Sequence, residues 1–266
     1  IGFGGGSTYL ALLLIWDVPY YIFPILALIC NIIVVSGNSI NFLKSKNINF
    51  NLLYPYLIGS IPFAFIGASI SIEKNLFPLT LGGEHSITVG CIEPFVKSYK
   101  NVTILQFDAH ADLRNSYNNQ KYSHASAMRR CLDFKNVDLI SIGIRNISKE
   151  EIPFLKKNTG RIKIFWAKDQ KKWNLKYFKR LIKNKNVYLT FDVDGLDSSI
   201  MPATGTPEPG GLFWYETLSL IKTTFKNANV IGADINELAP IKGFNSYNFL
   251  VAKLAYKILT YKFFLK

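Results

Sequence analysis

The stretch VTILQFDAHADLR, Val102–Arg114, gives the first evidence of the fold class. Its apolar first half predicts a buried β-strand, and its second half carries Asp108, His110 and Asp112 at alternate positions. Because a strand points every second side chain to the same face, these three polar groups lie together where the strand ends. In open parallel α/β sheets the binding crevice lies at the carboxyl ends of the strands, so this stretch indicates a site of that kind.

Similar apolar runs recur along the chain and alternate with helix-like stretches. The strand-like runs are VTILQFD, VDLISIG, IKIFW, VYLTFDV and NVIGAD. The helix-like stretches lie around Ser86–Tyr99, Lys149–Lys157, Leu175–Lys183, Tyr215–Phe225 and, as a last amphipathic helix, Tyr247–Phe264. This alternation predicts an α/β fold with a mainly parallel sheet and helices on both faces. Since no internal repeat or low-complexity linker interrupts it, we predict a single domain over residues 1–266.

The composition limits the classes of partner and compartment. The 266 residues carry a formal net charge of +13, but no arginine-rich run, zinc-finger spacing or RNA-binding aromatic motif accompanies it. We therefore expect no nucleic-acid partner and interpret the excess lysine as solvated surface. The 3 cysteines are far apart and form no CxxC pair, which predicts reduced, buried thiols in a cytoplasmic protein.

Residues 1–72 differ from the rest because their only charged residues are Asp17, Lys44 and Lys46. Val18–Val35 is apolar and long enough to suggest a transmembrane helix. Two prolines and an asparagine interrupt it, and neither a flanking basic cluster nor a signal-peptide n-region is present. We favour buried strands and a core helix here, and membrane association of residues 9–35 stays open. The sequence begins with Ile rather than Met, so a preceding segment also stays open.

Polar clusters follow three of the strand-like runs and one turn. LTFDVDGLD supplies Asp192 and Asp194, VIGADINE ends in Glu237, and LTLGGEHSIT turns at two glycines before His85 opens a helix. With the first stretch, they give six candidate metal ligands: His85, Asp108, His110, Asp112, Asp192 and Asp194. Each piece alone could be a surface turn, a calcium loop or a core histidine. Together they are too rich in oxygen for a closed zinc site and suit Mn²⁺. Two such ions about 3.5–4 Å apart can lower the pKa of a shared water.

Motifs in a fixed order resemble one known family. GGEHS, DAHADLR, YSHASAMRR, SIGIR, FDVDGLDSSIMPATGTPEPGGL and DINELAP occur in the order seen in the ureohydrolases, which include arginases and agmatinases. The resemblance runs from about Phe77 to the C-terminus and is strongest to the agmatinase branch. It implies a three-layer α/β/α fold, two Mn²⁺ ions per subunit, and hydrolysis of a guanidino group to urea and an amine. Agmatine, yielding putrescine for polyamine biosynthesis, is the expected substrate, and a homotrimer or homohexamer is the expected assembly.

The same resemblance implies a role for each site residue. One Mn²⁺ would be bound by His85, Asp108, Asp112 and Asp192, and the other by His110, Asp108, Asp192 and Asp194. Asp112 would also hydrogen-bond the attacking water, Glu237 would bind the guanidinium group by charge-assisted pairing, and His124 would relay protons. Asp112, His124 and Glu237 are therefore the expected catalytic residues.

Several departures from the family pattern leave the substrate open. The apolar residues 1–72 hold no clear counterpart of the family's substrate-side loop, apart from GGGST near the start. Uncharged residues replace usual acids after DLR, and Ser198 and Ala203 stand where Pro and Gly are usual. Arginine, guanidinobutyrate or formiminoglutamate are alternative substrates, and a non-catalytic ureohydrolase-like protein is an alternative class. A binuclear metallophosphoesterase is disfavoured because no histidine follows His124.

Overall fold

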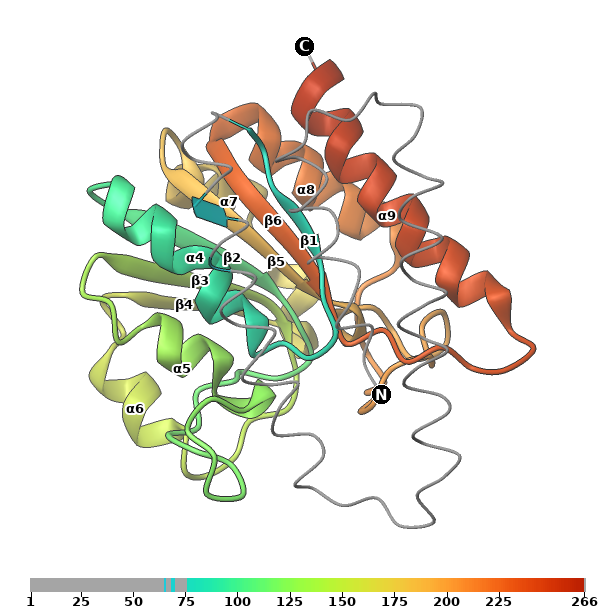
Figure 1. The fold of residues 1–266 in the computed structure, drawn as a ribbon, viewed down its shortest axis with the longest axis horizontal. Helices are drawn as coiled ribbons and strands as arrows, with labels where there is room; N and C mark the ends of the chain where they lie inside the picture. The colour runs from blue at the N-terminus through green and yellow to red at the C-terminus, as the bar shows by residue number, and fades with distance from the viewer. Residues whose placement is uncertain (1–64, 66–67, 70–75, 266) are drawn as a thin grey trace.

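The computed structural model describes Phe65, Ala68, Ser69 and residues 76–265. The expectations for Cys30 and for the apolar segment Val18–Val35 lie outside the described residues. Within the described part, the centre of the molecule is a six-stranded sheet in the order β1-β6-β5-β2-β3-β4 (Figure 1). Every neighbouring pair is parallel, as the alternating pattern predicts. The strands are β1 (Leu79–Leu81), β2 (Val102–Phe107), β3 (Val137–Ile144), β4 (Ile162–Trp166), β5 (Asn186–Asp192) and β6 (Asn229–Asn236).

Helices connect these strands and cover both faces of the sheet (Figure 1). They are α4 (Ile87–Ser98), α5 (Ala127–Cys131), α6 (Ile152–Lys157), α7 (Leu175–Ile182), α8 (Trp214–Asn227) and α9 (Asn245–Phe264). Three short 3₁₀ helices follow strands or loops: η1 (His124–Ser126), η2 (Ala167–Lys172) and η3 (Val193–Gly195). The five predicted helices and five predicted strands are thus confirmed, with β1 and α5 as additions that the pattern did not indicate.

Two separate hydrophobic clusters show that the sheet is the middle of three layers. Leu105 and Phe107 of β2 pack with residues of α7, α8 and α9 on one face. Ile104, the residue before Leu105, packs on the opposite face with residues of α4 and α5. Because alternate side chains of one strand enter different clusters, β2 is buried on both sides, which explains its continuous apolar sequence. The predicted α/β/α architecture is confirmed.

Two details differ from the sequence interpretation. His85 lies in the turn before α4 rather than at its first residue, because the helix begins at Ile87. Helix α9 buries Val251, Leu254 and Ile258 as one stripe, yet it leaves large aromatic side chains such as Phe249 exposed. Its amphipathic character is therefore weaker than expected.

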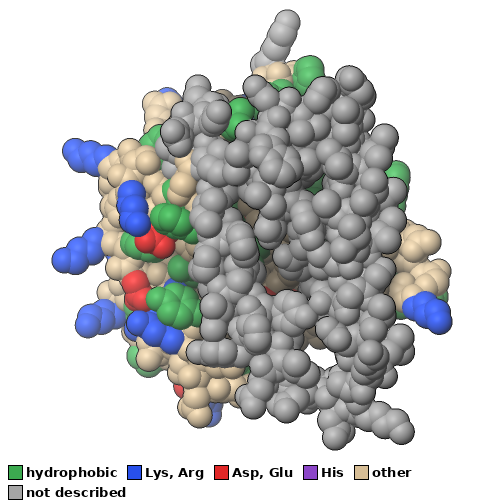
Figure 2. Space-filling model, viewed as in Figure 1, with side chains coloured by type: hydrophobic (Ala, Val, Ile, Leu, Met, Phe, Trp, Pro, Cys, Tyr) green, Lys and Arg blue, Asp and Glu red, His purple; other side chains and the backbone are tan. Residues whose placement is uncertain are grey.

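No lysine of the described residues is buried, as the interpretation of the excess lysine predicts, whereas Arg130 is buried. In Figure 2 the lysine and arginine side chains project singly from the margin of the described surface instead of forming one continuous basic patch on that face. Among the residues that the structure places, no helix is both long enough and apolar enough to cross a membrane. Cys91 and Cys131 are buried free thiols, in agreement with the prediction for these two cysteines.

Candidate metal centre

The candidate ligands converge at the carboxyl edge of the sheet. Strand β2 pairs directly with β5, and Phe107 lies opposite Phe191. Asp108 and Asp192, which follow these two residues, therefore lie side by side. The turn before α4 brings His85 to the same place, where it is completely buried. All six predicted ligands meet there, and His110 alone among them is partly exposed.

Close backbone approach makes this convergence possible. Gly195 ends η3, directly after Asp194, and a Cβ atom there would lie 2.8 Å from the backbone nitrogen of Asp108. The segment that carries Asp194 can therefore lie against the end of β2 only because residue 195 has no side chain. Asp112 itself has a φ of 53°, a left-handed conformation that non-glycine residues rarely adopt outside special sites.

The first group of ligands surrounds one ring nitrogen of His85. Its Nδ1 atom lies 3.0 Å from Asp112 Oδ2, 3.2 Å from Asp108 Oδ2 and 3.5 Å from Asp192 Oδ2. These are the four residues that the family resemblance assigns to one metal ion. His85, Asp108 and Asp192 each offer a ligand atom within 4.8 Å of the others, the spacing expected around one ion.

The second group of ligands shares Asp108 with the first. His110 Nδ1 lies 2.9 Å from Asp194 Oδ2 and 3.6 Å from Asp108 Oδ1. Asp108 thus presents one oxygen to each group, as a bridging carboxylate would. The structure groups Asp192 with His85 but not with His110, so the expected bridging role of Asp192 stays a prediction.

The hydrogen bonds of His85 fix which nitrogen can bind a metal. Thr190 Oγ1 donates its proton to Asp234 Oδ1 at 2.6 Å, so it must accept from His85 Nε2 at 2.9 Å. The proton of the neutral ring is therefore on Nε2, and the lone pair of Nδ1 faces the three carboxylates. That nitrogen has no hydrogen-bond partner among the described residues, although it is buried. A lone pair facing acids needs a cation between them, so these residues fit a divalent metal ion.

The electrostatics of the cluster support the same conclusion. Burial and the neighbouring Asp108 carboxylate raise the pKa of Asp112 to about 7. Burial and the carboxylates of Asp194 and Asp108 raise the pKa of Asp192 well above its usual value. Without a cation, this many converging acids must retain protons, and a divalent ion would replace them.

Buried polar residues of the strands support the ligands from behind, and the sequence reasoning missed them. Gln106 Nε2 donates to Asp108 Oδ2 at 2.7 Å, and Gln106 Oε1 accepts from Ser141 Oγ at 2.6 Å. The signal was a Gln, a Ser and a Thr within otherwise apolar runs of β2, β3 and β5. Such contacts hold a ligand in one orientation and thereby raise its affinity for metal.

The two other expected catalytic residues lie beside the cluster. Glu237 Oε1 accepts from the backbone N–H of His85 at 2.7 Å, and Glu237 has a left-handed φ of 64°. His124 begins η1, and its Nδ1 lies 2.8 Å from Glu84 Oε1. Both residues therefore touch the turn that carries His85. Glu84 lies within the motif GGEHS but is not among the site residues that the resemblance implies.

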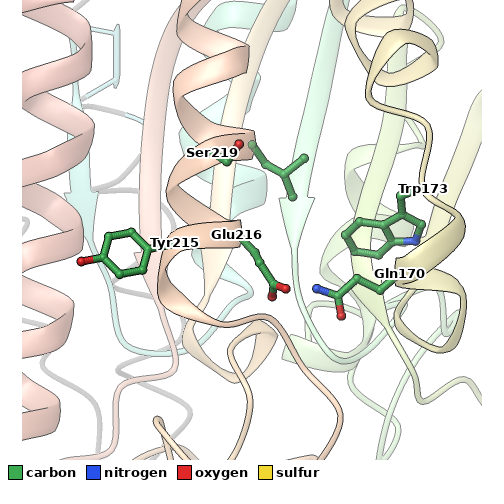
Figure 3. A pocket seen from close by; sticks show the side chains of 6 residues that line it. Gln170, Trp173, Tyr215, Glu216 and Ser219 are labelled. Carbon is green, nitrogen blue, oxygen red and sulfur yellow. The ribbon is translucent and has the colours of Figure 1, made fainter.

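A surface hollow elsewhere does not compete with this site. It is lined by Gln170, Trp173, Tyr215, Glu216, Ser219 and Leu220 (Figure 3). Trp173 Nε1 already donates to Trp166 O at 3.0 Å, and Glu216 Oε2 accepts from Phe213 N at 3.0 Å at the start of α8. The polar groups of Trp173 and Glu216 therefore serve the local structure.

Comparison with known proteins agrees with the site. The fold and the acid–histidine cluster define an α/β/α protein with a candidate metal centre. The chain belongs to the arginase family, whose model matches residues 67–260. It is 38% identical over 199 residues to the N(1)-aminopropylagmatine ureohydrolase of Synechocystis sp., a match that covers 73% of this chain and 64% of that protein. The agmatinase of Pyrococcus horikoshii is 35% identical over 191 residues, with 71% and 64% covered. The chain thus spans less than two thirds of the length of these relatives.

Solved structures show the same architecture. The agmatine ureohydrolase of Thermoplasma volcanium matches with a TM-score of 0.68 and 33% identity, covering 77% of this chain and 69% of that one. The arginase of Bacillus caldovelox also gives a TM-score of 0.68, over 79% and 76% of the two chains, but at 21% identity it supports the fold alone. The predicted resemblance to ureohydrolases is therefore confirmed.

Proposed function

We propose that this protein is a binuclear manganese hydrolase that converts agmatine to urea and putrescine. The observation that carries the proposal is the environment of His85, whose Nδ1 lone pair faces three carboxylate oxygens within 3.5 Å. A shared carboxylate, Asp108, links this group to the one around His110. In a chain of the arginase family, such a pair of groups supports a two-ion centre.

The proposed ligands follow the two groups. His85, Asp108, Asp112 and Asp192 would hold one Mn²⁺, and His110, Asp108, Asp192 and Asp194 would hold the other. Mixed imidazole and carboxylate donors suit Mn²⁺. What the bound metal would supply is a water of lowered pKa, able to attack near neutral pH.

The residues of the chain would orient the substrate and handle its protons. Glu237 Oε1 is engaged by the N–H of His85, which leaves Oε2 to accept from the guanidinium group. This contact would aim the carbon, a poor electrophile because its charge is delocalised, at the nucleophile. Asp112 would hold the attacking water by a hydrogen bond. His124 would give a proton to the departing amine, which leaves well only after protonation.

A second candidate substrate is N(1)-aminopropylagmatine, and a specific comparison favours it. The 38% identical relative from Synechocystis sp. carries that name, whereas the Pyrococcus relative is named an agmatinase at 35% identity. Both compounds present the same guanidino group to the site, and N(1)-aminopropylagmatine carries an added aminopropyl group, with a second amine, at the other end. The choice between them does not change the proposed chemistry.

The proposal is tested by urea release from the Mn²⁺-loaded protein. Agmatine, N(1)-aminopropylagmatine, arginine and guanidinobutyrate are compared at equal concentration by urea release, whereas formiminoglutamate, which has no guanidino group, is followed by release of formamide. The surface variant Asp169→Asn, whose side chain is 40% exposed, is assayed beside the parent as the control for Asp192→Asn. We expect urea from agmatine at the highest rate, with the control unchanged. A protein that binds two Mn²⁺ ions but releases no urea from any guanidino compound would identify the non-catalytic alternative instead.

The assembly and location belong to the same proposal. By analogy with the family we propose a homotrimer or homohexamer, and from the free thiols of Cys91 and Cys131 a cytoplasmic protein. Light scattering of the purified chain gives its mass in solution. A monomer that is fully active would contradict the proposed assembly without affecting the chemistry.

A further inference from the structure

Glu84 is a charged residue of the GGEHS turn whose two oxygens both have defined partners. Its Oε1 lies 2.8 Å from His124 Nδ1, and its Oε2 accepts from Ser86 Oγ at 2.8 Å. The residue immediately after it, His85, enters the metal cluster. One turn therefore contacts both the candidate metal centre and the candidate proton donor.

The turn itself is anchored to the end of β6. Gly82 N donates to Ile235 O at 2.9 Å, and Glu237 N donates to Gly83 O at 2.7 Å. A Cβ atom on Gly82 would lie 1.9 Å from Ile87 Cδ1, so the turn is also tightly packed against α4. Glu84 is thus held at a fixed position relative to Glu237, which would bind the substrate.

His124 is not held in place by packing alone. Its side chain is 46% exposed, and within the described part of the chain its ring contacts Tyr117, edge-on at 5.7 Å between centroids, and the carboxylate of Glu84. An ionised carboxylate can only accept a hydrogen bond, so Nδ1 must carry a proton. The atom left to exchange a proton with a substrate is then Nε2.

We propose that Glu84 is the positioning residue that holds the His124 ring with Nδ1 protonated and Nε2 free for proton transfer. The inference rests on the proposed function. As the C–N bond of the tetrahedral intermediate breaks, its electron pair stays on the amine nitrogen, which takes the proton from Nε2 of the imidazolium. His124 is left neutral, with its remaining proton on Nδ1 in the hydrogen bond to Glu84.

The charges that face His124 also favour its protonated form. The hydrogen bond to Glu84 is the largest influence, and together with the charges of Glu84, Glu237 and Asp112 it raises the pKa of His124 despite partial burial. Removal of the Glu84 charge lowers that pKa, so at a given pH a smaller fraction of His124 is protonated. The basic limb of the pH profile then moves to lower pH.

The test compares Glu84→Gln, Glu84→Asp and the matched surface control Glu93→Gln in the full-length, Mn²⁺-loaded protein. Glu93 pairs with Lys97 on α4 at 2.8 Å and lies outside the site. We expect Glu84→Gln to keep two Mn²⁺ ions and a KM within about twofold, while kcat falls by about 10- to 100-fold, within the range of general acid catalysis. Its basic limb should move to lower pH. Glu84→Asp should recover part of kcat, and Glu93→Gln should equal the parent protein.

A second readout separates this inference from the proposed function. The chain has 3 histidines, so ¹⁵N signals of labelled imidazoles are readily assigned after Mn²⁺ is exchanged for diamagnetic Zn²⁺. We expect His124 protonated on Nδ1 in the parent and a mixture of tautomers in Glu84→Gln. If these tautomers are found but the protein releases no urea, only the proposed function is contradicted, and the role of Glu84 stands. Parent-like kcat and tautomer in Glu84→Gln, or loss of Mn²⁺ or folding, would overturn the role of Glu84.

Discussion

The substitution Gly195→Ala tests whether close backbone contact creates the candidate metal centre. The new Cβ would lie 2.8 Å from Asp108 N and 3.0 Å from Phe107 C, both backbone atoms that cannot move aside alone. Ordinary Cβ contacts begin at 3.4 Å, so the two segments must separate by about 0.6 Å. Metal sites tolerate deviations of about 0.2 Å in ligand distance. The separation therefore exceeds what the group of Asp108, His110 and Asp194 can absorb.

Gly195→Ala should lower two measurable quantities, the affinity for Mn²⁺ and the free energy of unfolding. We expect the affinity for Mn²⁺ to fall by about 10- to 100-fold, the range found when groups that orient ligands are changed. We expect the free energy of unfolding to fall by about 1–3 kcal/mol, as in other overpacked sites. The affinity should change most for the ion in the group of Asp108, His110 and Asp194. The other ion is bound by His85, which lies on neither of the displaced segments.

Isothermal titration with Mn²⁺ and thermal unfolding of the metal-free protein measure these quantities. Gly160→Ala is the matched control, since among the described residues no atom beyond the two chain neighbours lies within 4 Å of a Cβ at that position. The control should bind Mn²⁺ as the parent does. If Gly195→Ala also bound Mn²⁺ and unfolded like the parent, close approach at Gly195 would not be what brings the ligands together.

Three further predictions concern the ligands and the substrate. Asp192→Asn should reduce Mn²⁺ content below one ion per chain. It should also reduce urea release by more than about 100-fold, since a ligand is lost rather than a supporting contact. Near-normal urea release would contradict the proposal that Asp192 binds both ions. Glu237→Gln should keep both ions but lower turnover of agmatine by about 10-fold or more, because a neutral amide pairs weakly with a guanidinium; unimpaired kcat/KM would remove Glu237 from the substrate site. The pKa of Asp112 is raised to about 7, so protons compete with Mn²⁺ below that pH and affinity should increase as pH rises through 7. Calorimetry at pH 6 in buffers of different ionisation enthalpy should show proton release, and a heat independent of buffer would contradict it.

The fold was largely predictable because its signals are local. Strands buried on both faces read as apolar runs, and β2 and β5 illustrate this with buried positions almost throughout. β1 was missed because it has only 3 residues, and α5 because it has only 5, too short to show a period. Residues 1–64 lie outside the described part, so the interpretation of the apolar N-terminal segment and of a single domain over residues 1–266 stays a prediction.

The metal ligands that follow strand ends could be predicted from the sequence. The hydrogen-bond partners of the site residues could not, because they come from segments that only the fold brings together. Alternation in DAHAD and the strand pairing of β2 with β5 together explain why Asp108 meets Asp192. The support of Asp108 by Gln106 depends on strands β2 and β3 being adjacent, which no local pattern encodes. Likewise, Glu84 and His124 are 40 positions apart, and only the three-dimensional path of the 108–124 segment brings them into contact.

The proposed binuclear centre is tested most directly by the number of Mn²⁺ ions that the chain needs for urea release. Metal-free protein is titrated with Mn²⁺ while bound metal and urea from agmatine are measured in the same samples. We expect urea release to require two ions per chain and to reach its maximum when the second is bound. Full activity with one ion, or full occupancy by two ions without urea, would contradict the proposed binuclear hydrolase.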